Sequence, residues 1–123
     1  MLRGSCMCGD IAFVVEGDVK GPSVCHCPQC RKQSGHLWSS AYAPEPAVKI
    51  EGPVSWYEAS ATAKRGFCAR CGSFLFWKAH DEDTMSFALG AIDGDTGITL
   101  EKHIFVGGKG DYYEIEDGVP QKP

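Results

Sequence analysis

Cys68-Ala69-Arg70-Cys71-Gly72 brings two thiols into one tight turn. In a turn of this shape both sulfurs approach one metal ion, backbone N–H groups point at sulfur, and Gly72 supplies the backbone conformation that must follow. A thioredoxin-like redox dithiol is the alternative, but it would open a long helix, and no helical pattern follows this pair. We therefore interpret the motif as half of a tetrahedral zinc site, which needs two further ligands.

The other five cysteines fall into two groups. The loop Cys25-His26-Cys27-Pro28-Gln29-Cys30 places three thiols close enough to wrap a single ion, and dividing them between two ions would strand one thiol. Cys6 and Cys8, near the N-terminus, then supply the two ligands that the Cys68–Cys71 turn, called the knuckle below, still needs. A metal ion held by all four would close the longest loop of the chain. The predicted ligand sets are Cys6, Cys8, Cys68 and Cys71 for one zinc ion, and Cys25, Cys27 and Cys30 for a second.

The two sites are expected to differ in role. A closed four-cysteine zinc site contributes about 10–16 kcal/mol in peptide systems, which compares with a net stability of about 5–15 kcal/mol for a domain. Three protein ligands and an open position are typical of a catalytic zinc. Because three ligands in one exposed loop enclose an ion less fully, we expect weaker binding and partial occupancy at the second site.

The open position has several possible occupants. Water, a substrate thiol or His26 could fill it, although His26 lies between two ligands in sequence and should point away from the ion. The alternative is a second structural site closed by His26, His36 or His103. His103, just before an apolar run, is also a candidate hydrogen-bonding residue at a strand end, and His80 in an acidic segment is expected at the surface.

Composition limits the remaining possibilities. The chain has 123 residues and a formal charge of −4 without a dominant basic patch, so nucleic acid is not an expected partner. No signal-peptide core or apolar run of about 18 residues is visible, so we expect no membrane association and a cytoplasmic location. In a reducing compartment, seven cysteines indicate metal ligands rather than a disulfide framework.

The pattern predicts a mainly β fold in one domain over residues 1–123. In Asp10–Gly17, Ile11, Phe13 and Val15 alternate with residues that face the other way. Val48–Glu51 and Val54–Glu58, separated by Gly52-Pro53, suggest a hairpin. One helical turn is expected after Pro28. Further strands are expected at Leu37–Ala43, Lys64–Phe67, Phe74–Lys78, Met85–Ile92 and His103–Val106.

Cationic and aromatic residues near the cysteines also carry expectations. Sites rich in thiolate need hydrogen-bond donors around the sulfur atoms. The cations nearest the cysteines in sequence are Arg3, Arg31, Lys32, Lys64, Arg65 and Arg70. Trp38, Trp56 and Trp77 are expected in the core rather than in a substrate cage.

Three segments together resemble the glutathione-dependent formaldehyde-activating enzyme family. They are Gly4-Ser5-Cys6-Met7-Cys8-Gly9-Asp10-Ile11, the run from Cys25 to Gly35, and the run from Phe67 to Trp77. The tail resembles the family as well, in His103-Ile104-Phe105-Val106, Tyr112-Tyr113-Glu114-Ile115 and Asp117-Gly118-Val119-Pro120. The resemblance implies a β-tent of small antiparallel sheets pinned by zinc, and it implies the same two ligand sets.

The activity implied by the resemblance is the joining of glutathione to formaldehyde to give S-hydroxymethylglutathione, a carbon–sulfur lyase reaction in the reverse sense. A thiol at the open zinc position would lose its proton and attack the aldehyde carbon. Arg31 and Lys32 are candidates for holding a glutathione carboxylate, and His26 is a candidate proton shuttle. The alternatives are a non-catalytic glutathione carrier and a zinc-pinned protein-interaction module.

Overall fold

The computed structural model describes residues 1–123 and is mainly β, as the sequence predicts. Its ten strands form two sheets. The strands are β1 (Leu2–Ser5), β2 (Ala12–Val15), β3 (Lys20–Cys25), β4 (Trp38–Pro44), β5 (Val48–Glu51), β6 (Val54–Glu58), β7 (Ala63–Cys68), β8 (Phe74–Ala79), β9 (Thr84–Ala88) and β10 (Lys102–Ile104). The helical segments are α1 (Pro28–Ser34), η1 (Glu45–Ala47), η2 (Leu89–Ala91) and η3 (Val106–Gly108).

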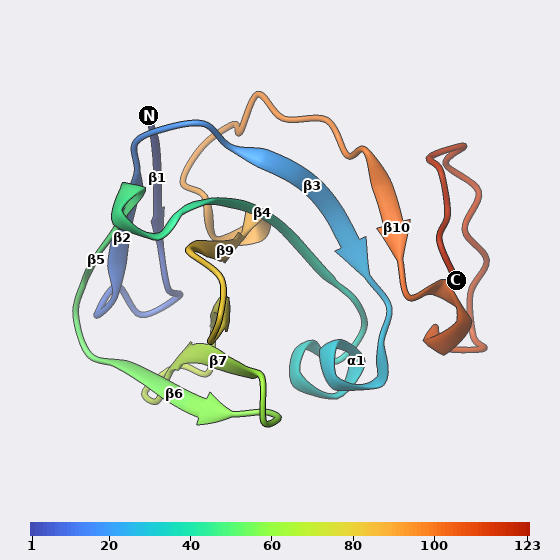
Figure 1. The fold of residues 1–123 in the computed structure, drawn as a ribbon, viewed down its shortest axis with the longest axis horizontal. Coiled ribbons are helices and arrows are strands. Elements are labelled where there is room, and N and C mark those ends of the chain that lie inside the picture. The colour runs from blue at the N-terminus through green and yellow to red at the C-terminus, as the bar shows by residue number, and fades with distance from the viewer.

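The two sheets differ in size. The smaller one has three antiparallel strands in the order β1-β2-β5, and the larger one has seven in the order β10-β3-β4-β9-β8-β7-β6. Every neighbouring pair in the larger sheet is antiparallel except β10, which runs parallel to β3. The small sheet and the C-terminal segment lie at opposite ends of the molecule (Figure 1).

The core joins the two sheets through aromatic packing. The alternation predicted around β2 is correct, because Ile11, Phe13 and Val15 are all buried. The ring of Phe13 meets those of Phe76 and Phe87 from the large sheet, with centroids 5.0 and 6.1 Å apart. Edge-on and tilted contacts at these distances are the favoured arrangements of aromatic pairs.

The single α-helix follows from local signals. Pro28 stands at its first position, Cys27 caps its N-terminus, and Gly35 ends it in the left-handed conformation. The helix is two turns long rather than the single turn expected. None of the helical segments has the length and apolar character needed to cross a bilayer.

The predicted hairpin of Val48–Glu51 and Val54–Glu58 is wrong. β5 pairs with β2 in the small sheet, and β6 pairs with β7 in the large one, so the chain changes sheets at Gly52-Pro53. A glycine–proline pair breaks a strand in either case, and only the distant pairing partners decide which case applies.

The sheet crossing gives a test of the fold. Gly52 has a φ of +106°, and a Cβ there would overlap the backbone carbonyl of Asp10. Gly52→Ala should therefore lower the free energy of unfolding by about 2–5 kcal/mol, combining backbone strain with overpacking. Gly94→Ala is the matched control, because Gly94 has a φ of +80° but open space around its Cβ position. Its loss should be about 1–2 kcal/mol, and equal losses in denaturant unfolding would contradict this account.

Candidate metal centres

The predicted four-cysteine set lies together in the structure. The sulfur atoms of Cys6, Cys8, Cys68 and Cys71 are all within 4.8 Å of one another. The Sγ–Sγ distances are 3.6 Å for Cys6–Cys8 and 3.7 Å for Cys8–Cys68. A tetrahedral zinc with Zn–S bonds of about 2.3 Å places its sulfurs about 3.8 Å apart, so the donor set and spacing fit zinc.

Backbone turns present these sulfurs. The loop after β1 directs the N–H of Ile11 to Cys6 Sγ at 3.3 Å, and the knuckle directs the N–H of Cys71 to Cys68 Sγ at 3.5 Å. The hydroxyl of Ser73, 3.2 Å from Cys71 Sγ, and then its backbone N–H lower the pKa of Cys71 to about 5. Donors of this kind favour the thiolate form, which is the form that binds metal.

The cluster connects the two sheets. Cys6 and Cys8 lie in the turn between β1 and β2, whereas Cys68 ends β7 of the large sheet. The Met7 N–H also donates to Ser73 Oγ at 3.0 Å, so the two cysteine turns are hydrogen-bonded directly. A metal bound here would fix the small sheet to the large one.

The three-cysteine set is also assembled. Cys25, Cys27 and Cys30 have their sulfurs within 4.8 Å of one another, and no histidine, aspartate or glutamate joins them. The N–H of Cys30 donates to Cys27 Sγ at 3.3 Å. Cys25 and Cys30 are buried, so the expectation of an exposed loop is wrong for two of the three. The donor set fits a zinc ion that keeps one position free of protein.

A buried arginine, Arg65, contacts the three-cysteine cluster. Arg65 is 5% exposed, and its Nη1 lies 3.5 Å from Cys30 Sγ and 3.3 Å from Gln33 Oε1. The Cys25 thiol, and then this guanidinium, lower the pKa of Cys30 to about 6 against the opposing effect of burial. Arg65 has no carboxylate partner, so Cys30 in its thiolate form is the anionic group that faces this guanidinium.

The histidines considered as fourth ligands are all engaged elsewhere. His26 Nε2 lies 2.9 Å from His103 Nδ1, and His26 Nδ1 is hydrogen-bonded to the hydroxyl of Tyr113. His103 Nε2 lies 2.8 Å from Asp117 Oδ2. His36 Nδ1 lies 2.7 Å from the hydroxyl of Tyr112. The first three contacts form one chain of hydrogen bonds between the cysteine loop and the C-terminal segment.

The comparisons with known proteins agree with this geometry. The family model described as "Glutathione-dependent formaldehyde-activating enzyme" matches residues 1–108. The chain belongs to this family. A protein of Halomonas elongata named "Putative glutathione-dependent formaldehyde-activating enzyme" is 33% identical, with 94% of this chain and 82% of that protein aligned. An uncharacterized lyase of Schizosaccharomyces pombe is 27% identical, with 92% and 84% aligned.

A solved structure supports the fold of this family member. A crystal structure of a Rhodobacter sphaeroides protein superposes with a TM-score of 0.64 and 22% sequence identity. The superposition covers 77% of this chain and 91% of that protein. At this identity the likeness concerns the fold alone.

The cationic residues that are close to the cysteines in sequence lie in different environments in the structure. Arg31 donates through Nε to the carbonyl of Gly108 at 2.8 Å, and Arg70 pairs with Asp10 at 3.0 Å. Lys64 lies over the ring of Trp56. Lys32 lines a cavity of about 490 Å³ together with Arg65, and no acidic residue lines that cavity. Of the six cations, Arg65 is therefore the one that contacts sulfur.

Sequence reasoning missed the tail residues that hold the histidines. Tyr113 and Asp117 carry no local signal for a distant partner, since their contacts depend on how the segment after β10 folds back. Arg65, named from the sequence only as one of six nearby cations, had a further usable signal, because it lies two residues after Ala63 and therefore on the same face of β7, which is buried.

The four-cysteine cluster predicts a large difference between two cysteine variants. Cys71→Ala should abolish cooperative folding, because it removes a ligand from the set that connects the sheets. Cys27→Ala should leave a folded protein, because its cluster joins residues close in sequence, from the end of β3 to the first turns of α1, and connects no distant segments. Thermal unfolding followed by circular dichroism compares them directly. An unchanged melting curve for Cys71→Ala would show that this cluster does not hold the fold together.

Chelation should empty the two sites in order. The three-cysteine set offers one ligand fewer, so mild chelation should remove its metal first while the fold persists. Metal content by mass spectrometry, read beside circular dichroism, gives the order of loss. Simultaneous loss from both sites, or earlier loss from the four-cysteine set, would contradict this order of metal affinity.

Proposed function

We propose that this chain is a zinc-dependent enzyme of the carbon–sulfur lyase type that joins a thiol such as glutathione to an aldehyde. The observation that carries the proposal is the gathering of three cysteine sulfurs without a fourth protein ligand. The names of the relatives support glutathione and formaldehyde as the reference substrates. The unpaired state of all seven cysteines supports a location in the cytoplasm.

Zinc at Cys25, Cys27 and Cys30 would supply a position at which a substrate thiol ionises at neutral pH. Three thiolates already outweigh the charge of the ion, so a soft sulfur ligand suits the open position better than a carbonyl oxygen. The buried guanidinium of Arg65 beside Cys30 offsets the extra negative charge of a substrate thiolate.

The cavity beside α1 is a suitable place for the anionic part of the thiol. Lys32 and Arg65 both line it and nothing acidic opposes them, so a carboxylate would be attracted there. Arg31 stays a candidate for the same carboxylate through the N–H groups that Gly108 does not take. Lys32 is the better placed of the two.

The reaction conserves oxidation state. The sulfur electron pair forms the carbon–sulfur bond, the carbonyl π pair moves to oxygen, and the proton given up by the thiol ends on that oxygen. His26 was the candidate carrier of this proton, but it is fully buried and both ring nitrogens are hydrogen-bonded. We therefore propose that His26 positions the cysteine loop and that solvent carries the proton from the thiol to the carbonyl oxygen.

Cobalt substitution tests the proposal. Adding glutathione to the cobalt-substituted protein should change the sulfur-to-metal charge-transfer band, because a fourth thiolate joins the ion. Cys27→Ala should remove the response. Lys32→Ala should weaken glutathione binding by about 1 kcal/mol, the upper range for an exposed charge pair, and Lys49→Ala in the small sheet is the matched control.

One result would reject the proposed enzymatic function. No spectral change at millimolar thiol would mean that the site accepts no substrate sulfur. Binding of glutathione without acceleration of its addition to formaldehyde would instead leave a carrier.

A further inference from the structure

The loop that carries the three-cysteine cluster is held from outside by the C-terminal part of the chain. His26 stands between Cys25 and Cys27, and its backbone N–H donates to the carbonyl of Ile104, the last residue of β10, at 3.1 Å. This bond continues the parallel pairing of β10 with β3, in which Ile104 lies opposite Cys25. The backbone at the first ligand therefore depends on where β10 lies.

The His26 side chain is bonded to the same part of the chain through both ring nitrogens. Nδ1 is hydrogen-bonded to the hydroxyl of Tyr113, and Nε2 lies 2.9 Å from Nδ1 of His103 in β10. His26 is fully buried, so water does not replace either partner. A buried ring nitrogen without a partner destabilises the conformation that buries it. Tyr113 and His103 therefore favour the loop conformation that is observed.

Tyr113 is itself fixed by several contacts. Its ring stacks on that of His26 with centroids 5.8 Å apart, and it meets the ring of His36 at 4.6 Å. Lys109 Nζ donates to the carbonyl of Tyr113 at 2.6 Å and lies 4.8 Å from the centroid of its ring. The hydroxyl of Tyr113 is thus held at His26 and is not at the end of a free side chain.

The segment η3 contacts the loop beside the other two ligands. The carbonyl of Gly108 accepts a hydrogen bond from Nε of Arg31, which follows Cys30 in sequence. A Cβ at Gly108 would lie 3.1 Å from Cδ of Pro28 and 3.5 Å from Cα of Cys27, so the two segments are in close contact. Each of the three ligands is therefore next to a residue that contacts the segment 102–113.

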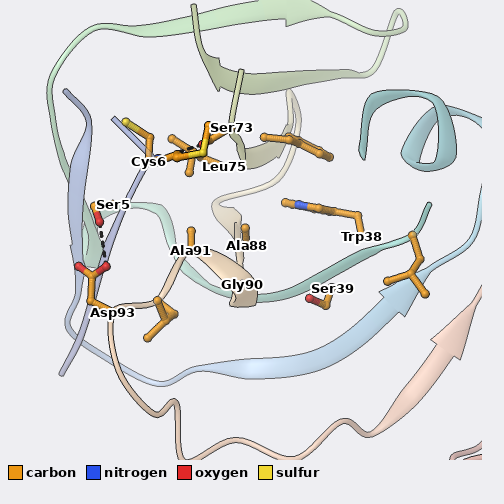
Figure 2. A pocket seen from close by; sticks show the side chains of 14 residues that line it. Ser5, Cys6, Trp38, Ser39, Ser73, Leu75, Ala88, Gly90, Ala91 and Asp93 are labelled. Carbon is orange, nitrogen blue, oxygen red and sulfur yellow. Dashed lines mark hydrogen bonds between the residues drawn. The ribbon is translucent and has the colours of Figure 1, made fainter. Parts of the chain in front are cut away.

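Apolar groups pack against the cluster as well. Trp38 and Ala88 belong to an apolar cluster with Cys25 and Cys30. Figure 2 shows Trp38 and Ala88 beside a cavity that extends to Cys6 of the four-cysteine site. Packing of this kind is not directional, so it does not by itself fix how three sulfur atoms are arranged. The hydrogen bonds from the C-terminal part of the chain are directional.

We propose that Tyr113 is a positioning residue for the three-cysteine site, which acts through His26 to keep the sulfur atoms in the arrangement that binds the second metal ion. This role rests on the proposed function in placing a metal ion at these sulfurs. A loop already in the binding conformation binds more tightly, because less of the free protein is in conformations that cannot bind. Removing the Tyr113 hydroxyl lowers that competent fraction.

Cobalt titration of Tyr113→Phe tests this role. The three-cysteine site is identified by the part of the sulfur-to-cobalt charge-transfer absorption that Cys27→Ala lacks, and its affinity is measured by competition with a chelator. Tyr113→Phe should weaken cobalt binding at this site roughly 5- to 30-fold, the factor for one hydrogen bond lost while its partner nitrogen stays buried. The cobalt affinity of the four-cysteine site should not change.

Tyr112→Phe is the matched control. The hydroxyl of Tyr112 lies 2.7 Å from Nδ1 of His36, a histidine outside the segment between Cys25 and Cys30. The control removes the same group from the neighbouring residue, so the cobalt affinity should stay at the value of the parent protein. Equal losses in the two variants would mean that any loosening of the tail weakens the site, and would overturn the specific role of Tyr113.

Hydrogen exchange gives a second measurement, which decides if Tyr113→Phe does not fold. Because coupling between two sites is reciprocal, metal at the three cysteines should slow amide exchange in residues 103–122 of the parent protein. The amides to follow include Lys122 N–H, which donates to the His103 carbonyl at 2.9 Å, and Val106 N–H, which donates to the Lys122 carbonyl at 2.9 Å. In folded Tyr113→Phe this slowing should be smaller.

Two results overturn the proposal. They are unchanged cobalt affinity in Tyr113→Phe, and tail exchange in the parent protein that does not respond to metal at the three-cysteine site. A cobalt response to glutathione together with unchanged affinity in Tyr113→Phe would keep the enzyme and reject the positioning role. Weakened affinity in Tyr113→Phe without any response of the parent protein to glutathione would support the positioning role and reject the enzyme.

Discussion

The rest of the structure depends on four sulfur atoms that meet between the two sheets. Cys6 and Cys8 come from the small sheet, and Cys68 and Cys71 come from the knuckle at the end of β7. The packing of Phe13 against Phe76 and Phe87 also links the two sheets. A structural zinc contributes about as much as the whole net stability of a domain of this size, so a zinc ion bound by these four sulfurs would couple metal binding to folding.

The sequence predicted the cysteine sets because their spacing is local. Three thiols in six residues, or two in four, are brought together by a turn whatever the remaining chain does. The hairpin at Gly52-Pro53 failed because the same local break serves a turn within one sheet or a crossing between two. Strand pairing is a long-range choice, and the missed contacts of Tyr113 and Asp117 are of the same long-range kind.

The histidines show why a nearby donor is not always a ligand. His26 is flanked by two cysteines, yet its ring turns away to His103 and Tyr113. A consistent set of donors runs in one direction, from the Tyr113 hydroxyl through His26 and His103 to the carboxylate of Asp117. Burial is the largest cause that lowers the pKa of His26, so the neutral ring required by this chain is also the favoured one. The C-terminal segment thereby keeps histidine off the three-cysteine site.

The groups around the three-cysteine cluster differ in character. Arg65 contacts Cys30 and lines a cavity together with Lys32, whereas Trp38 and Phe74 form an apolar cluster with Cys25 and Cys30. A buried arginine without a carboxylate is costly unless a negative group compensates it, and Cys30, whose thiolate form the guanidinium of Arg65 favours, is the group in contact with it. Under the proposed function, the charge of Arg65 would also offset that of a substrate thiolate. In that role Arg65 would link the composition of the site to a preference for sulfur ligands.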